Sequence, residues 1–221
     1  MRIAVVGGTG KEGQGLALGW ARAGQEVIIG SRALERAVQA ALAINREVGR
    51  TAATGMLNRE AAAAGEIVVL TVPYDAHEKT LLDIREAVRG KILVDVTVPI
   101  DPQNPRRLRI PSDGSATEEA QALLGPETRV VAAFQNISYT HLSQGEAIAC
   151  DVLTCGGDAQ ARQEVIRLAG LLGLRGLDAG PARNARVVEG LTVVLMEINR
   201  RYKVRGAGIR VTGLPDRDNE K

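Results

Sequence analysis

Aromatic residues are scarce in this chain. Among its 221 residues it has one Trp, three Tyr and one Phe. Proteins that bind single-stranded nucleic acid stack the bases on aromatic side chains that lie beside basic ones, and no stretch of this sequence combines the two. The formal net charge of +2 is also small. We therefore expect no nucleic-acid partner.

Long apolar runs are missing as well. No run approaches the roughly 20 apolar residues that a bilayer-spanning helix needs. The N-terminal residues Met1–Val6 enter a strand pattern directly, without the charged region, apolar core and cleavage site of a secretory signal. We expect a cytoplasmic protein that has no membrane partner.

Cysteine and histidine are rare. Cys150 and Cys155 have neither a C-x-x-C spacing nor partner histidines, so we interpret both as structural and expect no metal. His77 is predicted to lie at the surface or to cap a helix, and His141 has no carboxylate at a spacing that would give it a role. Hydrolase and phosphotransferase functions are disfavoured, because no Ser/His/Asp arrangement and no P-loop is present.

Short apolar runs alternate with segments of helical character. The runs are Ile3–Val6, Val27–Ile29, Ile67–Leu70, Ile92–Val96 and Val130–Ala133, and helices are predicted over Ala33–Val48 and Tyr74–Val88. Consecutive apolar positions indicate strands that are covered on both faces, which favours a parallel sheet with right-handed crossovers. The sequence thus predicts an α/β fold with a doubly wound, mostly parallel, Rossmann-like sheet.

The second half of the chain extends this fold. Strands at Cys150–Leu153 and Leu174–Leu177, with a helix from about Asp158 to Leu172 between them, carry the sheet beyond six strands. Four prolines between Pro99 and Pro111 predict a surface loop. The amphipathic segment Ala182–Tyr202 predicts a long helix that either closes the fold or packs against another subunit.

We expect a single domain over residues 1–221. Its nucleotide-binding half covers about 1–98, and its acceptor-binding and closing part, a helical and strand extension, covers about 99–213.

A glycine-rich motif lies between the first predicted strand and the helix that follows. Gly8-Thr9-Gly10-Lys11-Glu12-Gly13 is a G-x-G-x-x-G sequence in the context that dinucleotide binding requires. Gly8 would permit the tight turn, Gly10 would let backbone N–H groups approach a pyrophosphate, and Gly13 would let the helix pack closely. The alternative is that these glycines only make a turn.

The end of the second strand indicates which nucleotide binds. An NAD enzyme has a carboxylate there, about 20 residues beyond the motif, to bind the ribose 2′-hydroxyl. This chain has Gly30-Ser31-Arg32 instead. The Ser31 hydroxyl can donate to a 2′-phosphate and the Arg32 guanidinium can pair with it, which predicts NADP(H). Arg36 shares the helical face of Arg32 and is either a second cation for the phosphate or a solvated charge.

Two further strand ends should lie at the same edge of the sheet. Thr71-Val72-Pro73-Tyr74 and Thr97-Val98-Pro99 follow buried strands. We expect Val72 and Val98 to pack against the ribose or the nicotinamide, with Pro73 and Pro99 fixing the direction of the chain. The alternative is that these prolines merely end strands.

A polar segment follows the next strand. Gln135-Asn136-Ile137-Ser138 offers amide and hydroxyl donors that a flat, carbonyl-rich ring could use. We place the acceptor site there, with Gln135, Asn136 and Ser138 as positioning residues and no certain catalytic residue. A polar loop that only makes turns is the alternative.

These segments resemble the family of F420-dependent NADP oxidoreductases, also called NADPH-dependent F420 reductases. In the nucleotide half the resemblance is carried by Arg2–Gly10, Gly13–Leu18 and Val27–Arg32. More specific is the distal run Leu177–Pro181, continued by Asn184, Arg186, Val188-Glu189 and Leu191-Thr192, which is similar to the closing helix of the family. The resemblance spans nearly the whole chain.

The resemblance implies a small Rossmann-like homodimer that passes a hydride reversibly between the nicotinamide C4 and the deazaflavin C5 of coenzyme F420. Matched by position, Thr9, Gly10, Lys11 and Glu12 would hold phosphates, Ser31, Arg32 and Arg36 the 2′-phosphate, and Val72 and Val98 the nicotinamide side. The chain departs from the family at Gln135, where His is common, and near Ser138, where a small residue or proline is usual.

Two other functions share the predicted nucleotide site. One is an NADPH-dependent reductase of another small acceptor, such as a flavin, a quinone, an imine or a ferric chelate. The other is a non-catalytic NADP(H) sensor that signals through a partner.

Overall fold

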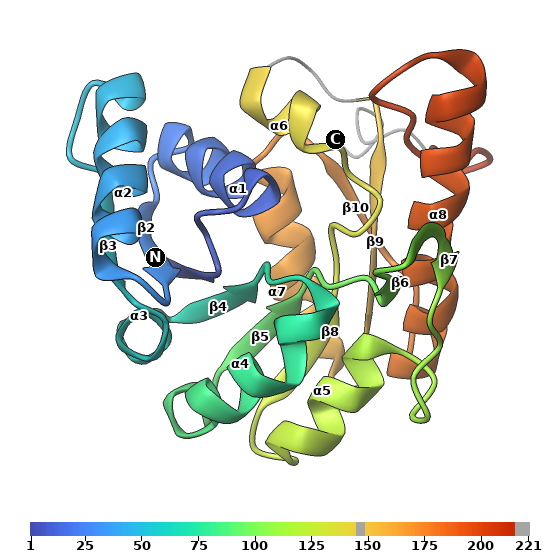
Figure 1. Ribbon diagram of the computed structural model, residues 1–221, viewed down its shortest axis with the longest axis horizontal. Coiled ribbons are helices and arrows are strands. Elements are labelled where there is room, and N and C mark those ends of the chain that lie inside the picture. The colour runs from blue at the N-terminus through green and yellow to red at the C-terminus, as the bar shows by residue number, and fades with distance from the viewer. Residues whose placement is uncertain (145–148, 215–221) are drawn as a thin grey trace.

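The computed structural model describes residues 1–144 and 149–214. Within them, eight strands form one sheet in the order β10-β9-β8-β5-β4-β1-β2-β3 (Figure 1). The strands are β1 (Arg2–Val6), β2 (Glu26–Ser31), β3 (Ala53–Leu57), β4 (Ile67–Leu70), β5 (Ile92–Asp95), β8 (Arg129–Ala132), β9 (Asp151–Gly156) and β10 (Arg175–Asp178). Only the β8–β9 pair of this sheet is antiparallel, so the predicted mostly parallel α/β sheet of more than six strands is confirmed.

The helices cover both faces of the sheet. They are α1 (Lys11–Arg22), α2 (Leu34–Val48), α3 (Asn58–Ala64), α4 (His77–Ile84), α5 (Ala116–Leu124), α6 (Tyr139–Gln144), α7 (Ala159–Gly170) and α8 (Ala185–Tyr202), with 3-10 turns at Tyr74–Ala76, Arg85–Val88 and Ala182–Asn184. Ile3 and Val5 of β1 share an apolar cluster with residues of α1, α2 and α7. Ala4 and Val6 point to the other face and pack with residues of α3, α4 and α5. Burial on both faces explains why these strands are continuous apolar runs.

The strand order reverses beside β1. The chain runs outward from β1 to β2 and β3, and then returns to β4 on the other side of β1. In a doubly wound sheet, ligands bind outside the carboxyl ends of the strands at such a reversal. The topology thus directs attention to the segments that follow β1, β2, β4 and β5.

Two strand predictions need correction. The edge strand β3 was not predicted, because Thr54 and Gly55 interrupt its apolar pattern. The segment Pro99–Pro111, predicted to be a loop, contains an antiparallel hairpin of β6 (Ile100–Asp101) and β7 (Asn104–Leu108). Pro102 lies in the turn of the hairpin. A two-stranded ribbon leaves backbone groups unpaired along its outer edges, so it tolerates proline better than a central strand does.

The long C-terminal helix closes one face of the fold. Ala185 and Val188 of α8 pack on Ala132 and Cys155, so one face of this helix closes the fold as predicted. Cys150 and Cys155 are both buried and free, as their structural interpretation requires. Among the described helices, none is long and apolar enough to cross a membrane.

Candidate functional site

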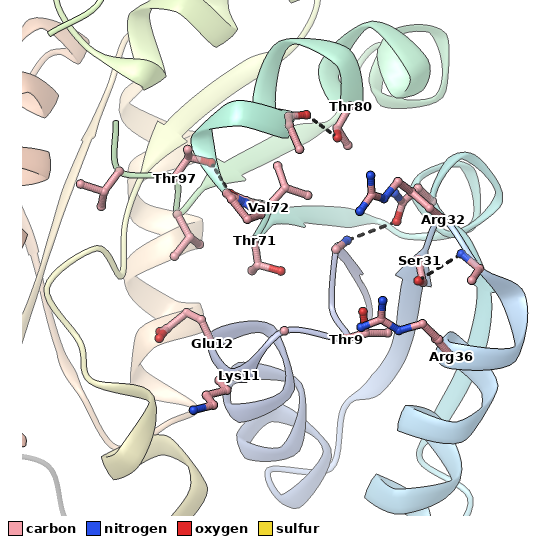
Figure 2. Close-up of a pocket in the computed structure, with 18 of the residues that line it drawn as sticks. Thr9, Lys11, Glu12, Ser31, Arg32, Arg36, Thr71, Val72, Thr80 and Thr97 are labelled. Carbon is pink, nitrogen blue, oxygen red and sulfur yellow. Dashed lines mark hydrogen bonds between the residues drawn. The ribbon is translucent and has the colours of Figure 1, made fainter. Parts of the chain in front are cut away.

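A cavity of about 660 Å³ lies at the carboxyl ends of β1, β2, β4 and β5, where the strand order reverses (Figure 2). Its size is that of a typical small-ligand site. Most residues of the predicted nucleotide site line it: Thr9, Gly10, Lys11, Glu12, Ser31, Arg32, Arg36, Val72, Pro73 and Val98. The structure therefore brings together side chains that lie up to 89 residues apart in the sequence, from Thr9 to Val98.

The glycines between β1 and α1 have separate tasks. The left-handed residue of the turn is Gly7, with a φ of 74°, and not Gly8 as the motif suggested. A Cβ on Gly8 would lie 2.7 Å from the Val5 carbonyl oxygen, and one on Gly13 would lie 2.8 Å from the Gly8 Cα. Both positions therefore need glycine for packing. A Cβ on Gly10 would meet only the Gly7 oxygen, at 3.8 Å. The side of the turn on which Gly10 lies is therefore open.

The N-terminus of α1 faces this open side without a side-chain cap. Gly10 is the N-cap residue, so no N-cap side chain accepts a hydrogen bond from the first turn. The first N–H groups of a helix have no partner within the helix, and they favour an anion. Asn58 of α3 holds the turn in place, because its Oδ1 accepts a hydrogen bond from the Gly7 N–H at 3.2 Å. Sequence reasoning missed Asn58, since no motif links it to the glycines.

Two arginines lie at the other end of the cavity. Arg32 and Arg36 lie on the opposite side of the cavity from Glu12 (Figure 2). Ser31 Oγ accepts a hydrogen bond from the Ala33 N–H at 3.3 Å, so its own proton stays available for donation. Arg32 precedes α2, so it does not share a helical face with Arg36 as predicted, but Ser31 and both arginines line the same cavity.

A second cavity continues from this basic end. It encloses about 670 Å³ and shares Ser31 and Arg32 with the first. Arg59 of α3 and Lys79 of α4 add two cations to its lining. No sequence motif predicts these two residues, because only the fold brings α3 and α4 beside the end of β2.

The ends of β4 and β5 form the wall opposite α1. Thr71 Oγ1 donates to the Val6 carbonyl at 3.0 Å, and Val72 and Pro73 line the cavity. Val98 lines it from the end of β5. Pro99 lies outside the lining, where its carbonyl accepts from the Arg109 N–H at the base of the hairpin.

A third cavity, of about 380 Å³, adjoins the first. It is lined by Gln135, Asn136 and Ser138, by residues of α8, and by Arg205. Glu12, Val96 and Val98 line both this cavity and the first one. The predicted nucleotide and acceptor sites therefore meet at these three residues.

The two amides of the acceptor segment are oriented differently from the expectation. Gln135 Nε2 donates to the Asp95 carbonyl at 2.8 Å, and Asn136 Nδ2 donates to the Asp151 carbonyl at 2.8 Å. Because a carbonyl can only accept, these bonds fix which end of each amide is the nitrogen. Both amide oxygens are buried and have no hydrogen-bond partner in the described part of the chain. The amides thus offer acceptors where donors were expected.

Ser138 and His141 anchor the C-terminal segment that follows α8. Ser138 Oγ donates to the Arg205 carbonyl at 3.0 Å and is 2.7 Å from Thr140 Oγ1. His141 Nε2 lies 2.9 Å from the Gly206 carbonyl. The Ser138 hydroxyl therefore fixes the segment around Arg205, which lines the third cavity.

Phe134 precedes these amides in a strained backbone conformation. Its φ is 72°, a region that side-chain-bearing residues seldom adopt. The ring is fully buried and packs edge-on against Trp20, with centroids 5.8 Å apart. Such strain costs on the order of 1–3 kcal/mol and is found at binding sites more often than elsewhere.

The surface position predicted for His77 is wrong, although the residue does lie at the start of a helix, α4. Its side chain is fully buried, and Nε2 lies 2.8 Å from Asp95 Oδ2. Burial alone would lower the pKa of His77, but the Asp95 carboxylate outweighs it with help from Glu119 and Glu189, and the pKa is raised. His77 begins α4 and Asp95 ends β5, so the sequence shows no spacing that pairs them.

Glu189, from the distal run, binds α8 to α5. Its carboxylate accepts hydrogen bonds from the backbone N–H groups of Ala116 and Thr117 at 2.9 and 3.1 Å, and from Thr117 Oγ1 at 2.9 Å. Burial raises the pKa of Glu189 to about 7, against the effect of these bonds. Glu189 of the distal run therefore supports the acceptor side by joining α8 to α5.

Comparison with known proteins agrees with this geometry. Residues 2–99 match the family described as NADP oxidoreductase, coenzyme F420-dependent. Over its length the chain is 44% identical to the F420-dependent NADP reductase of Methanothermobacter thermautotrophicus, with 99% of this chain and 97% of the relative covered. The chain belongs to the F420-dependent NADP reductase family.

Further members and structures support this assignment. The F420-dependent NADP reductase of Methanocaldococcus jannaschii is 40% identical, with 97% of this chain and 99% of the relative covered. A solved structure from Arthrobacter sp. FB24, assigned as an F420-dependent NADP reductase, has a TM-score of 0.81 at 26% identity and covers 96% of this chain and 99% of its own. The Rossmann-like fold and the resemblance seen in the sequence are confirmed.

Proposed function

We propose that this chain transfers a hydride between NADP(H) and coenzyme F420 where its two adjoining cavities meet. The chain is an oxidoreductase, and both substrates follow from its full-length relatives. In one direction NADPH, oxidised F420 and a proton give NADP⁺ and reduced F420. The observation that supports the location is that Glu12, Val96 and Val98 line both cavities.

The nucleotide half, about residues 1–98, fits NADP(H). The pyrophosphate lies at the uncapped N-terminus of α1, where Thr9–Gly13 present backbone N–H groups and Gly10 leaves room for close approach. The 2′-phosphate lies beside Ser31, Arg32 and Arg36. This placement uses the two ends of one cavity, which Figure 2 shows on opposite sides.

The nicotinamide end of the nucleotide reaches the junction. Val72 and Val98 pack against it, and Pro73 and Pro99 set the direction of the two segments that carry them. Hydride transfer between stacked rings needs alignment at about 3–3.5 Å and exclusion of water. The apolar side chains of Val96, Val98 and Phe134 keep the junction dry.

The acceptor part, about residues 99–213, fits the deazaflavin ring. The free oxygens of Gln135 and Asn136 accept hydrogen bonds from N–H groups of the reduced ring, which satisfies two buried polar atoms that lack partners among the described residues. Ser138 holds the wall formed by Arg205. The residues thus act by positioning.

The test of direct transfer is an isotope experiment. NADPH carrying deuterium at one face of C4 is mixed with the protein and oxidised F420, and the reduced F420 is analysed by mass spectrometry. We expect one deuterium per molecule of product from one of the two labelled forms. Product that contains only solvent hydrogen from both forms would contradict direct transfer, and no product at all would favour another acceptor or a sensor.

We further propose that the protein is a homodimer formed through α8. Val187, Val194 and Tyr202 are 64%, 54% and 75% exposed and, with Ile198, make one apolar stripe along this helix. Exposed apolar stripes of this kind mark protein contacts. A second copy of the chain is the occupant that the family resemblance implies. A location in the cytoplasm and the absence of a nucleic-acid partner stay predictions.

A further inference from the structure

Glu12 occupies an unusual position for an acidic residue. It is the second residue of α1, beside the open side of the glycine turn, and it lines both the nucleotide and the acceptor cavity. Figure 2 shows its side chain next to Lys11, at the end of the cavity away from Arg36. Its Oε1 atom is buried and has no hydrogen-bond partner in the described part of the chain.

A carboxylate at this point is costly. Taking an unpaired charge out of water is so unfavourable that the group neutralises instead. Burial raises the pKa of Glu12 to about 8. At neutral pH the side chain is therefore mainly a carboxylic acid, which has an O–H group to donate.

The charged and titratable groups near Glu12 do not compensate a negative charge on its carboxylate. Lys11 Nζ lies over the Tyr139 ring of α6, 5.2 Å from its centroid. His141 of α6 is bound to the Gly206 carbonyl, and the exposed Arg205 lies at the edge of the acceptor cavity. The walls from β4 and β5 contribute Thr71, Val96 and Val98, which do not titrate.

We propose that NADP(H) binds to the form of the protein in which Glu12 carries a proton, and that this acid O–H is the hydrogen-bond donor at the junction of the two cavities. The inference rests on the proposed position of the pyrophosphate at α1. A Glu12 carboxylate would repel that group and would leave a buried charge beside the junction of the two cavities. Above the pKa of the free protein, binding must therefore take up a proton at a Glu12 carboxylate oxygen.

Calorimetry measures this proton directly. NADP⁺ is titrated into the protein at pH 8.8 in two buffers with different ionisation enthalpies, and the difference in heat gives the protons taken up. The 2′-phosphate is fully ionised at this pH, because its second pKa is about 6. We expect nearly one proton per NADP⁺ for the wild type, and a Kd that rises about tenfold per pH unit well above pH 8.

Two variants identify the group that takes up the proton. Glu12→Gln has the same shape and is permanently neutral, so we expect no proton uptake and a Kd for NADP⁺ that does not change between pH 7 and 9.5. Glu164→Gln removes an exposed acid of α7 that pairs with Arg167 outside both cavities, and it should behave as the wild type. Thermal unfolding of each variant checks that it is folded.

Each outcome decides a separate point. A wild-type Kd that is constant over this range, without proton uptake, overturns the inference while the nucleotide site stands. Proton uptake that persists in Glu12→Gln assigns the proton to another group and overturns the inference. A folded Glu12→Gln variant that no longer binds NADP⁺ overturns the inference as well. If Glu12→Gln does not fold, the wild-type proton count decides alone. A wild type that does not bind NADP⁺ at pH 7 contradicts the proposed nucleotide site instead.

Discussion

His77 Nε2 lies 2.8 Å from Asp95 Oδ2, and both side chains are fully buried under the wall that the two cavities share. The other Asp95 oxygen, Oδ1, accepts from the Thr97 N–H at 3.0 Å, and the Asp95 carbonyl accepts from Gln135 Nε2 at 2.8 Å. One buried residue thus connects α4, the end of β5 and the acceptor segment.

This pair makes stability depend on pH. Because the pKa of His77 in the folded protein is raised above its usual value of about 6.5, the charged pair stabilises the fold fully below pH 6.5. Its contribution is lost as the pH rises through the raised pKa. We expect the difference in free energy of unfolding between wild type and His77→Gln, measured with urea, to be larger at pH 5.8 than at pH 8.8. An unchanged difference would mean that folding does not shift the pKa of His77, and a smaller difference at pH 5.8 would mean that the buried ring stays neutral.

Arg32 should determine the choice of nucleotide. Removing a charge-assisted hydrogen bond to the 2′-phosphate costs about 1.5–3 kcal/mol, so Arg32→Ala should weaken NADPH binding by about ten- to a hundredfold. NADH lacks this phosphate, and its Kd should hardly change. Both Kd values can be measured by nucleotide fluorescence.

Arg46→Ala is the matched control for this experiment. Arg46 lies on α2, the helix that follows Arg32, is exposed and lines neither the nucleotide nor the acceptor cavity. It should leave both Kd values unchanged. Equal losses of NADPH and NADH affinity in Arg32→Ala would contradict the 2′-phosphate site.

Gln135 should affect the acceptor and not the nucleotide. Gln135→Met keeps the length of the side chain but removes the free amide oxygen, and a lost hydrogen bond of about 1.4 kcal/mol corresponds to a factor of ten. We expect kcat/KM for F420 to fall by about that factor, while the Kd for NADPH measured without F420 stays the same. A parallel loss of NADPH binding would place Gln135 in the nucleotide site.

The apolar stripe on α8 should hold two copies of the chain together. A charge at the centre of an apolar interface is buried without a partner, so Val194→Lys should give a monomer. Light scattering measures the mass. Leu82→Lys, at a residue of α4 that is 51% exposed, is the control and should keep the wild-type mass. A wild-type monomer, or a dimer that survives Val194→Lys, would rule out this interface.

Much of the nucleotide half was predictable because its signals are local. Strands such as β1 and β4 are runs of buried apolar residues, and the glycine motif carries its own context of strand and helix. The Ser31-Arg32 pair follows the second strand, which is where a dinucleotide-binding fold contacts the adenosine ribose. These features require no knowledge of contacts between distant residues.

The remaining features depend on long-range contacts. Asn58 reaches Gly7 across 51 residues, and Glu189 reaches Thr117 across 72. The pairing of His77 with Asp95, and the direction of the Gln135 amide, are decided by which backbone carbonyl or carboxylate the fold brings near. Residue types alone cannot specify such partners.

The most direct test of the account mixes the protein with oxidised F420 and either NADPH or NADH while the absorbance band of the deazaflavin is followed. We predict rapid bleaching with NADPH and little with NADH, because the reaction requires both the ring junction and the 2′-phosphate site. No bleaching with either nucleotide would contradict hydride transfer to F420, and equal rates with both would contradict the role of Ser31, Arg32 and Arg36.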